Sequence, residues 1–133
     1  MTKLNTDGSW TEEGTVGAGM VLRDTLGNII YSSCRELFRC RDALEAELCA
    51  CMEGLSLAIQ RTDLPIWLEM DSLLPVNMVN GRQTDRSVYA SLVAEIKHLR
   101  SLRMTCIAHV KRSQNLVSDF LVKFASREHR TVV

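Results

Sequence analysis

The order in which strand-like and helix-like patterns follow one another constrains this chain most. Alternating or β-branched runs typical of strands come first, at Lys3–Asp7, Ala18–Arg23 and Asn28–Ser33. The short segment Asp24–Gly27, with glycine at its end, predicts a hairpin turn between the second and third runs. A helical periodicity begins only afterwards, at Ala43–Gln60. The first part of the chain therefore predicts a three-stranded meander followed by a helix.

The rest of the chain alternates between the two patterns. Strand-like runs are Ile66–Asp71 and Met104–Val110, and helical patterns are Leu73–Asn80, Ser87–Leu102 and Leu116–His129. A meander followed by alternating elements predicts an α/β protein with a five-stranded mixed sheet flanked by helices. In the helix that begins near Ser87, the apolar residues expected on one face are Val88, Leu92, Ile96 and Leu99.

Length and charge narrow the class of protein. A chain of 133 residues is long enough for one sizeable core, so we expect a single domain over 1–133, acting as a monomer. The formal net charge is zero, which gives no sign of a strong electrostatic footprint for nucleic acid or for a membrane. No apolar run approaches the roughly 20 residues of a membrane span.

The cysteines argue for a reducing compartment. There are five, an odd number at irregular spacing, and they form no CxxC pair, so zinc binding is not expected. Cys49 and Cys51 fall in an apolar helical pattern, where reduced cysteine behaves as a small hydrophobic residue. An intracellular setting, nuclear or cytoplasmic, is expected.

Four acidic residues stand where a carboxylate is costly. Asp7 and Asp71 end strand-like runs, Glu47 lies in the apolar helix and Asp119 lies within the last helical pattern. A carboxylate beside a core is unfavourable unless a cation compensates it. The four together therefore predict a divalent-metal site.

Glu47 can be separated from the other acids of its helix by periodicity. Small residues that let a helix approach a sheet form one stripe, and Glu47 lies on it; the stripe is Ala43, Ala50, Gly54 and Ala58. Glu45 and Glu53 lie on the solvent face and are expected to be ordinary surface charges. A salt-bridged acid at the core edge is the alternative for Glu47.

Each of the other acids also has a plainer explanation. Asp7 is followed by Gly8, a pair that most often marks a turn. Asp119 could complement the dipole of its helix. In the fourth strand Glu69 faces the same way as Asp71, so either could be functional, and we expect Glu69 to be structural, either paired or at a sheet face. Asp71 stands at the carboxyl end of the strand, where open α/β sheets bind their ligands.

Four short motifs, taken together, carry a family resemblance. They are Asp7-Gly8-Ser9, Ala46-Glu47-Leu48, Met70-Asp71-Ser72 and the spaced set His109, Asn115 and Asp119. In this order, on these elements, they resemble the ribonuclease H family, and most closely the plant-type ribonuclease H-like domain associated with retroelement reverse transcriptases. The likeness covers nearly the whole chain.

The resemblance implies a ribonuclease H-like fold and a catalytic set. Asp7, Glu47, Asp71 and Asp119 would hold two Mg²⁺ or Mn²⁺ ions, and His109 would handle protons and product release. The substrate would be an RNA/DNA hybrid, contacted by Gly8, Ser9, Ser72, Arg112 and Asn115. Two hard cations about 3.5–4 Å apart suit phosphodiester hydrolysis, because they stabilise both the attacking and the leaving oxygen. The chain would then be an endoribonuclease, free-standing or part of a larger polyprotein.

The sequence departs from the family at residues that would contact the substrate. The segment Arg41–Ala46 lacks the polar residues of the best-known bacterial relatives, and Leu73 stands where they carry glutamine. The basic residues that remain are Arg82, Arg86, Lys97, His98, Arg100 and Arg103. They would form either a hybrid-binding ridge or an ordinary solvated face. A nucleic-acid or protein-binding module on the same fold, or another nuclease or transposase of this superfamily, stays open beside the ribonuclease.

Overall fold

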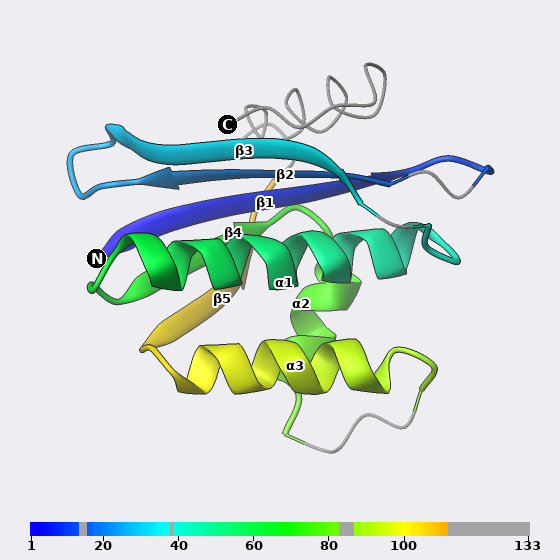
Figure 1. Ribbon diagram of the computed structural model, residues 1–133. Coiled ribbons are helices and arrows are strands. Elements are labelled where there is room, and N and C mark those ends of the chain that lie inside the picture. Colours follow the sequence, from blue (N-terminus) through cyan, green and yellow to red (C-terminus); the bar gives the residue numbers. More distant parts are fainter. Residues whose placement is uncertain (14–15, 38, 83–86, 112–133) are drawn as a thin grey trace.

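The computed structural model describes residues 1–13, 16–37, 39–82 and 87–111. Within them a sheet of five strands carries helices (Figure 1). The strands are β1 Thr2–Trp10, β2 Val16–Arg23, β3 Ile29–Leu37, β4 Ile66–Met70 and β5 Thr105–His109. The helices are α1 Ala43–Arg61, α2 Leu73–Asn80 and α3 Ala90–Ser101. The predicted helix Leu116–His129 lies outside the described residues.

The sheet is mixed, as the sequence predicts, with strand order β3-β2-β1-β4-β5. β1 pairs antiparallel with β2 and β2 with β3, whereas β1–β4 and β4–β5 are parallel. The predicted hairpin turn joins β2 to β3. Its Gly27 has φ +86°, and Asp24 Oδ1 accepts hydrogen bonds from the backbone N–H of Leu26 and of Asn28, both at 2.9 Å.

α1 lies along one face of the sheet and contacts β1, β2 and α3 (Figure 1). It starts where Asp42 Oδ1 accepts from the Glu45 N–H at 2.8 Å, an N-cap bond. The predicted small-residue stripe permits the close approach, because a Cβ atom on Gly54 would come within 2.5 Å of Thr6 Cγ2. The core between them is made of fully buried side chains such as Leu4, Leu22, Leu48, Leu55 and Leu68.

The sequence misplaces the start of α3. The predicted helix begins at Ser87, but α3 begins at Ala90, and Val88 is 64% exposed rather than packed on the core. Ser87 Oγ accepts from the Tyr89 N–H at 3.1 Å, a local bond that holds this segment in a turn. Val93 and Ile96 are the buried residues of α3.

All five strands differ in their bounds from the predicted ones, β2 starting at Val16 and β5 covering only Thr105–His109. β1 continues past Asp7 to Trp10, and β3 continues to Leu37, because β2 offers both of them partners as far as Val16. β4 ends at Met70, one residue before Asp71. Among the described residues no helix has the length and apolar character to cross a membrane.

Candidate metal centre

Asp7 and Asp71 are brought together by the parallel pairing of β1 and β4. The last paired residues of the two strands are Asn5 and Glu69, and each aspartate lies two positions farther along its own strand direction. Asp7 is 4% exposed and lies inside β1, where it pairs with Gly19 of β2. The turn suggested by the Asp-Gly pair is therefore wrong: cross-strand pairing with β2 keeps both residues in the strand.

Glu47 reaches the same place from α1. A Cβ atom on Gly8 would overlap the carbonyl oxygen of Ala46 and come within 2.9 Å of the Glu47 backbone nitrogen. Gly8 thus lets the backbone of α1 rest against β1 beside Asp7. The resemblance assigns Gly8 to substrate contact, whereas this packing is a reason for glycine that the sequence did not disclose.

One carboxylate oxygen each from Asp7, Glu47 and Asp71 lies within 4.8 Å of the other two. Asp71 Oδ2 is buried and has no hydrogen-bond partner among the described residues. Three carboxylates this close repel one another, and a buried oxygen without a partner is costly. A divalent cation resolves both, and hard oxygen ligands suit Mg²⁺ or Mn²⁺. The donor set therefore fits the predicted ions.

A pocket of about 320 Å³ opens at this cluster. It is lined by Ala43, Leu44, Glu47, Asp71, Ser72 and Leu74. Ser72 is the N-cap residue of α2 and makes no side-chain cap bond, while Leu73 and Leu74 are more than half exposed. The acids thus face a solvent-open hollow with an apolar rim.

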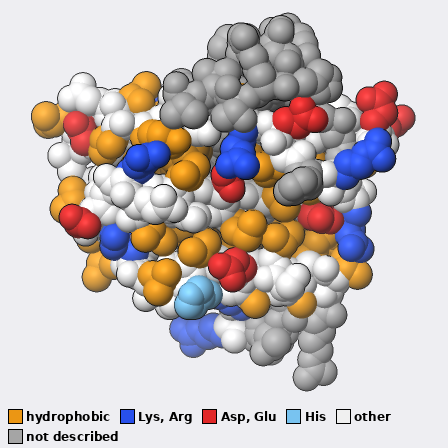
Figure 2. Space-filling model, viewed as in Figure 1, with side chains coloured by type: hydrophobic (Ala, Val, Ile, Leu, Met, Phe, Trp, Pro, Cys, Tyr) orange, Lys and Arg blue, Asp and Glu red, His pale blue; other side chains and the backbone are white. Residues whose placement is uncertain are grey.

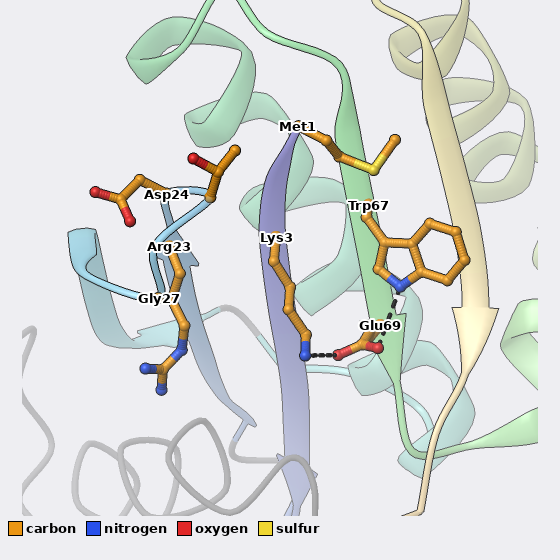
Figure 3. A pocket seen from close by; sticks show the side chains of 8 residues that line it. Met1, Lys3, Arg23, Asp24, Gly27, Trp67 and Glu69 are labelled. Carbon is orange, nitrogen blue, oxygen red and sulfur yellow. Dashed lines mark hydrogen bonds and ion pairs between the residues drawn. The ribbon is translucent and has the colours of Figure 1, made fainter.

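A larger pocket, of about 550 Å³, is lined by residues at the start of β1, in the β2–β3 turn and in β4 (Figure 3). Two acids line it: Asp24, whose carboxylate accepts the hydrogen bonds of the β2–β3 turn, and Glu69, which is 8% exposed and has protein partners. Lys3 Nζ lies 3.0 Å from its carboxylate, Trp67 Nε1 donates at 3.1 Å and Asn5 Nδ2 at 3.2 Å. Of the two arrangements expected for Glu69 the structure shows the paired one, so the smaller pocket, with its uncompensated oxygen, is the better candidate site.

His109 is the last residue of β5 and is exposed. Its Nε2 lies 3.2 Å from the backbone carbonyl oxygen of Asp71, so the ring stands beside the acid cluster. Ser9 lies in β1, and its buried Oγ has no partner among the described residues. The remaining predicted site residues, Arg112, Asn115 and Asp119, lie outside the described residues.

Two arginines of the basic set hold the fold together. Arg100 donates to Asn80 Oδ1 at 2.7 Å and to the carbonyls of Val79 and Thr105. Arg103 donates to the carbonyls of Ile59, Thr62 and Leu64. Positive and negative side chains are interspersed on the face seen in Figure 2. Arg100 and Arg103 thus form neither a hybrid-binding ridge nor a solvated face in this structure, because their guanidinium groups are bonded within the protein.

One cluster of side chains has no signal in the sequence. The sulfur atoms of Cys40 and Cys49 are 3.8 Å apart, next to Glu45. The two cysteines are nine residues apart in sequence, so they do not form the CxxC motif that would indicate a metal site. Burial raises the pKa of the Cys40 thiol to about 12 and that of Cys51 to about 12. The Cys40 and Cys51 thiols are therefore protonated near neutral pH, which makes them poor nucleophiles.

Comparison with known proteins identifies the class. A family model described as reverse transcriptase-like matches residues 5–125, so the chain belongs to that family. A ribonuclease H1 isolated from compost, LC11-RNase H1, has 24% identity over 96% of each chain, with a TM-score of 0.87. Ribonuclease H1 of the archaeon Halobacterium salinarum has 22% identity over 96% of this chain and 98% of its own, with a TM-score of 0.88. The fold is that of ribonuclease H.

The same fold occurs inside a larger protein. The prototype foamy virus protease-reverse transcriptase has 18% identity over 94% of this chain but only 20% of its own length, with a TM-score of 0.75. A comparison with curated protein sequences found no match.

Proposed function

We propose that this protein is a metal-dependent endonuclease that hydrolyses the RNA strand of RNA/DNA hybrids. The observation that carries the proposal is the convergence of Asp7, Glu47 and Asp71 on one cluster, at a pocket lined by Glu47 and Asp71, with a buried Asp71 oxygen that has no hydrogen-bond partner among the described residues. LC11-RNase H1 has also been crystallised with an RNA/DNA hybrid, with a TM-score of 0.86 to this chain.

The three acids would hold the hard divalent ions, with Asp119 as the fourth ligand that the resemblance implies. Two bound Mg²⁺ or Mn²⁺ ions would supply activation of the attacking water and charge stabilisation at the leaving oxygen. The protein's own part is positioning: β1 and β4 fix Asp7 and Asp71 side by side, and α1 presents Glu47 to both. His109, beside Asp71, would take up or release a proton at its ring nitrogen.

Substrate contact is proposed for the residues around this pocket. Ser72 lines it, Gly8 and Ser9 follow Asp7 in β1, and Arg112 and Asn115 complete the set that the resemblance implies. The match to a domain within a protease-reverse transcriptase supports a role for this chain inside a larger polyprotein. Mass spectrometry of the protein from its source cells would test that part, since a mass equal to the 133 residues alone would contradict it.

The test is cleavage of a labelled RNA/DNA hybrid with and without Mg²⁺ or Mn²⁺. We expect metal-dependent cutting of the RNA strand, which Glu47→Gln abolishes. The matched control is Glu53→Gln, the same change on the same helix, at a residue paired with Arg35 and outside the acid cluster. The control should cut at the wild-type rate. No cleavage by the wild type at any metal concentration would refute the proposal.

A second function is favoured by the small number of basic side chains that could contact a nucleic acid. Arg100 and Arg103 are committed to backbone carbonyls, and the pocket rim carries exposed leucines in place of polar contacts. Phosphate contacts supply much of the affinity for nucleic acid, so a surface with few of them weakens the case for a nuclease that must hold a hybrid during catalysis. The alternative is a nucleic-acid or protein-binding module on the same fold that does not cleave. Hybrid binding measured by fluorescence anisotropy, without cleavage in either metal, would support this alternative over the nuclease.

A further inference from the structure

A second cluster of metal-binding side chains lies on a different face of α1 from Glu47. Glu45 and Cys49 are one helical turn apart on α1, and Cys40 comes from the segment that precedes the Asp42 N-cap. The two sulfur atoms are 3.8 Å apart, and one donor atom from each of the three residues lies within 4.8 Å of the others. Donors four residues apart share one helix face, the spacing used by helical metal ligands.

Two of the three donor residues, Cys40 and Glu45, are held in place by further contacts. Cys40 is 9% exposed and packs with Val16 and Ala46, and Trp10 Nε1 donates to its carbonyl oxygen at 3.1 Å. The Glu45 carboxylate accepts from the Arg41 backbone N–H at 3.2 Å and from Arg41 Nε at 3.0 Å. The cluster therefore needs little rearrangement to receive an ion.

The separation of the sulfur atoms matches a tetrahedral ion. Two thiolates bound at about 2.3 Å with a tetrahedral angle lie roughly 3.8 Å apart. A disulfide would require about 2.05 Å, so the observed 3.8 Å corresponds to a reduced pair. All five cysteines are reduced in the structure.

We propose that Cys40, Glu45 and Cys49 form a binding site for a thiophilic divalent ion of the Zn²⁺ class, separate from the carboxylate site. Two sulfur donors and one carboxylate suit Zn²⁺, with water in the fourth position, whereas the all-oxygen set of Asp7, Glu47 and Asp71 suits Mg²⁺ or Mn²⁺. Residues two positions apart on a helix do not share a face, so the two sites bind on different sides of α1.

Binding at this site would fasten the segment before α1 to the helix that carries Glu47. Both thiols must give up their protons to the solvent when the ion binds. An ion that binds only the folded protein raises its stability by mass action, which gives a readout independent of nuclease activity.

The test uses Co²⁺ as a spectroscopic substitute for Zn²⁺, with the reduced full chain. We expect one equivalent of Co²⁺ to give a thiolate-to-metal charge-transfer band, which Zn²⁺ then displaces. The band should be lost in Cys40→Ser and in Cys49→Ser, and weakened in Glu45→Gln. Cys106→Ser is the matched control, because Cys106 is exposed on β5 and outside the cluster.

Asp71→Asn separates this proposal from the proposed function, since it removes a carboxylate ligand and leaves every thiol intact. The charge-transfer band should persist in that variant. Thermal unfolding gives the second readout: Zn²⁺ should raise Tm in the wild type and in Cys106→Ser, but not in Cys49→Ser. Circular dichroism checks that each variant is folded. A wild type without the band, or a folded Cys49→Ser that keeps it, would overturn the site.

Discussion

Glu69 and Asp71 lie two residues apart, but the fold gives their carboxylates opposite surroundings. Glu69 is buried and has protein partners for its charge: Lys3, Asn5 and Trp67. Asp71 stands two residues later, among two other carboxylates, with a buried oxygen that has no partner in the described part of the chain. Stability accounts for the first arrangement, but it disfavours the second unless a cation binds there.

The comparison predicts that the two acids respond differently to the same chemical change, and Asp71→Asn should give the largest effect. Loss of one metal ligand should lower the rate of hybrid cleavage by about 10²-fold or more, on the scale of losing one transition-state contact. The free energy of unfolding measured in urea should be unchanged or slightly higher, because the repulsion among the three carboxylates is relieved.

The control for this prediction is Asp63→Asn, the same change at an exposed residue in the loop before β4. It should leave both cleavage and unfolding unaltered. If Asp71→Asn lowered the urea midpoint and left cleavage at the wild-type rate, Asp71 would belong with Glu69 as a structural acid.

Gly8→Ala should give the next effect, because it acts on the packing that brings Glu47 to Asp7. The new methyl group overlaps the Ala46 carbonyl oxygen, a backbone atom that cannot avoid the clash by a side-chain rotation. We expect a loss of about 1–3 kcal/mol in the free energy of unfolding. Cleavage by the remaining folded protein should also fall, since α1 must shift away from β1.

Gly27→Ala provides a contrast, since a Cβ atom there meets nothing within 4 Å and the cost comes only from its positive φ. It should lower stability by about 1 kcal/mol without changing the cleavage rate of the folded protein. Equal losses of activity in the two variants would mean that Gly8 has no particular role in placing Glu47.

How far the sequence predicts this site depends on which residues fix each element. Strand alternation predicted that Glu69 and Asp71 share a face. The small residues of α1 correctly indicated its close approach to the sheet at Gly54. The Asp7-Gly8 pair misled, because only the partner strand β2 and the backbone of α1 keep it extended. The Cys40–Cys49 pair could not be found, because Cys40 lies before α1 and Cys49 lies inside it, and no fixed spacing relates a loop residue to a helical one.

Glu69→Gln should give the smallest effect and would sharpen the comparison most. The amide keeps the shape and one acceptor oxygen, but it loses the ion pair with Lys3, whose side chain is 49% exposed and whose charge is therefore screened. A screened pair contributes about 0–1 kcal/mol, and the weakened bonds from Asn5 and Trp67 add to this, so we expect a loss of about 1 kcal/mol in urea unfolding. Lys3→Gln should lose less, because it leaves the bonds from Asn5 and Trp67 in place. Neither variant should change the rate of hybrid cleavage, since the carboxylate they alter is already compensated by the protein. A fall in cleavage comparable to that of Asp71→Asn, at wild-type stability, would move Glu69 into the metal centre and erase the distinction between the two acids.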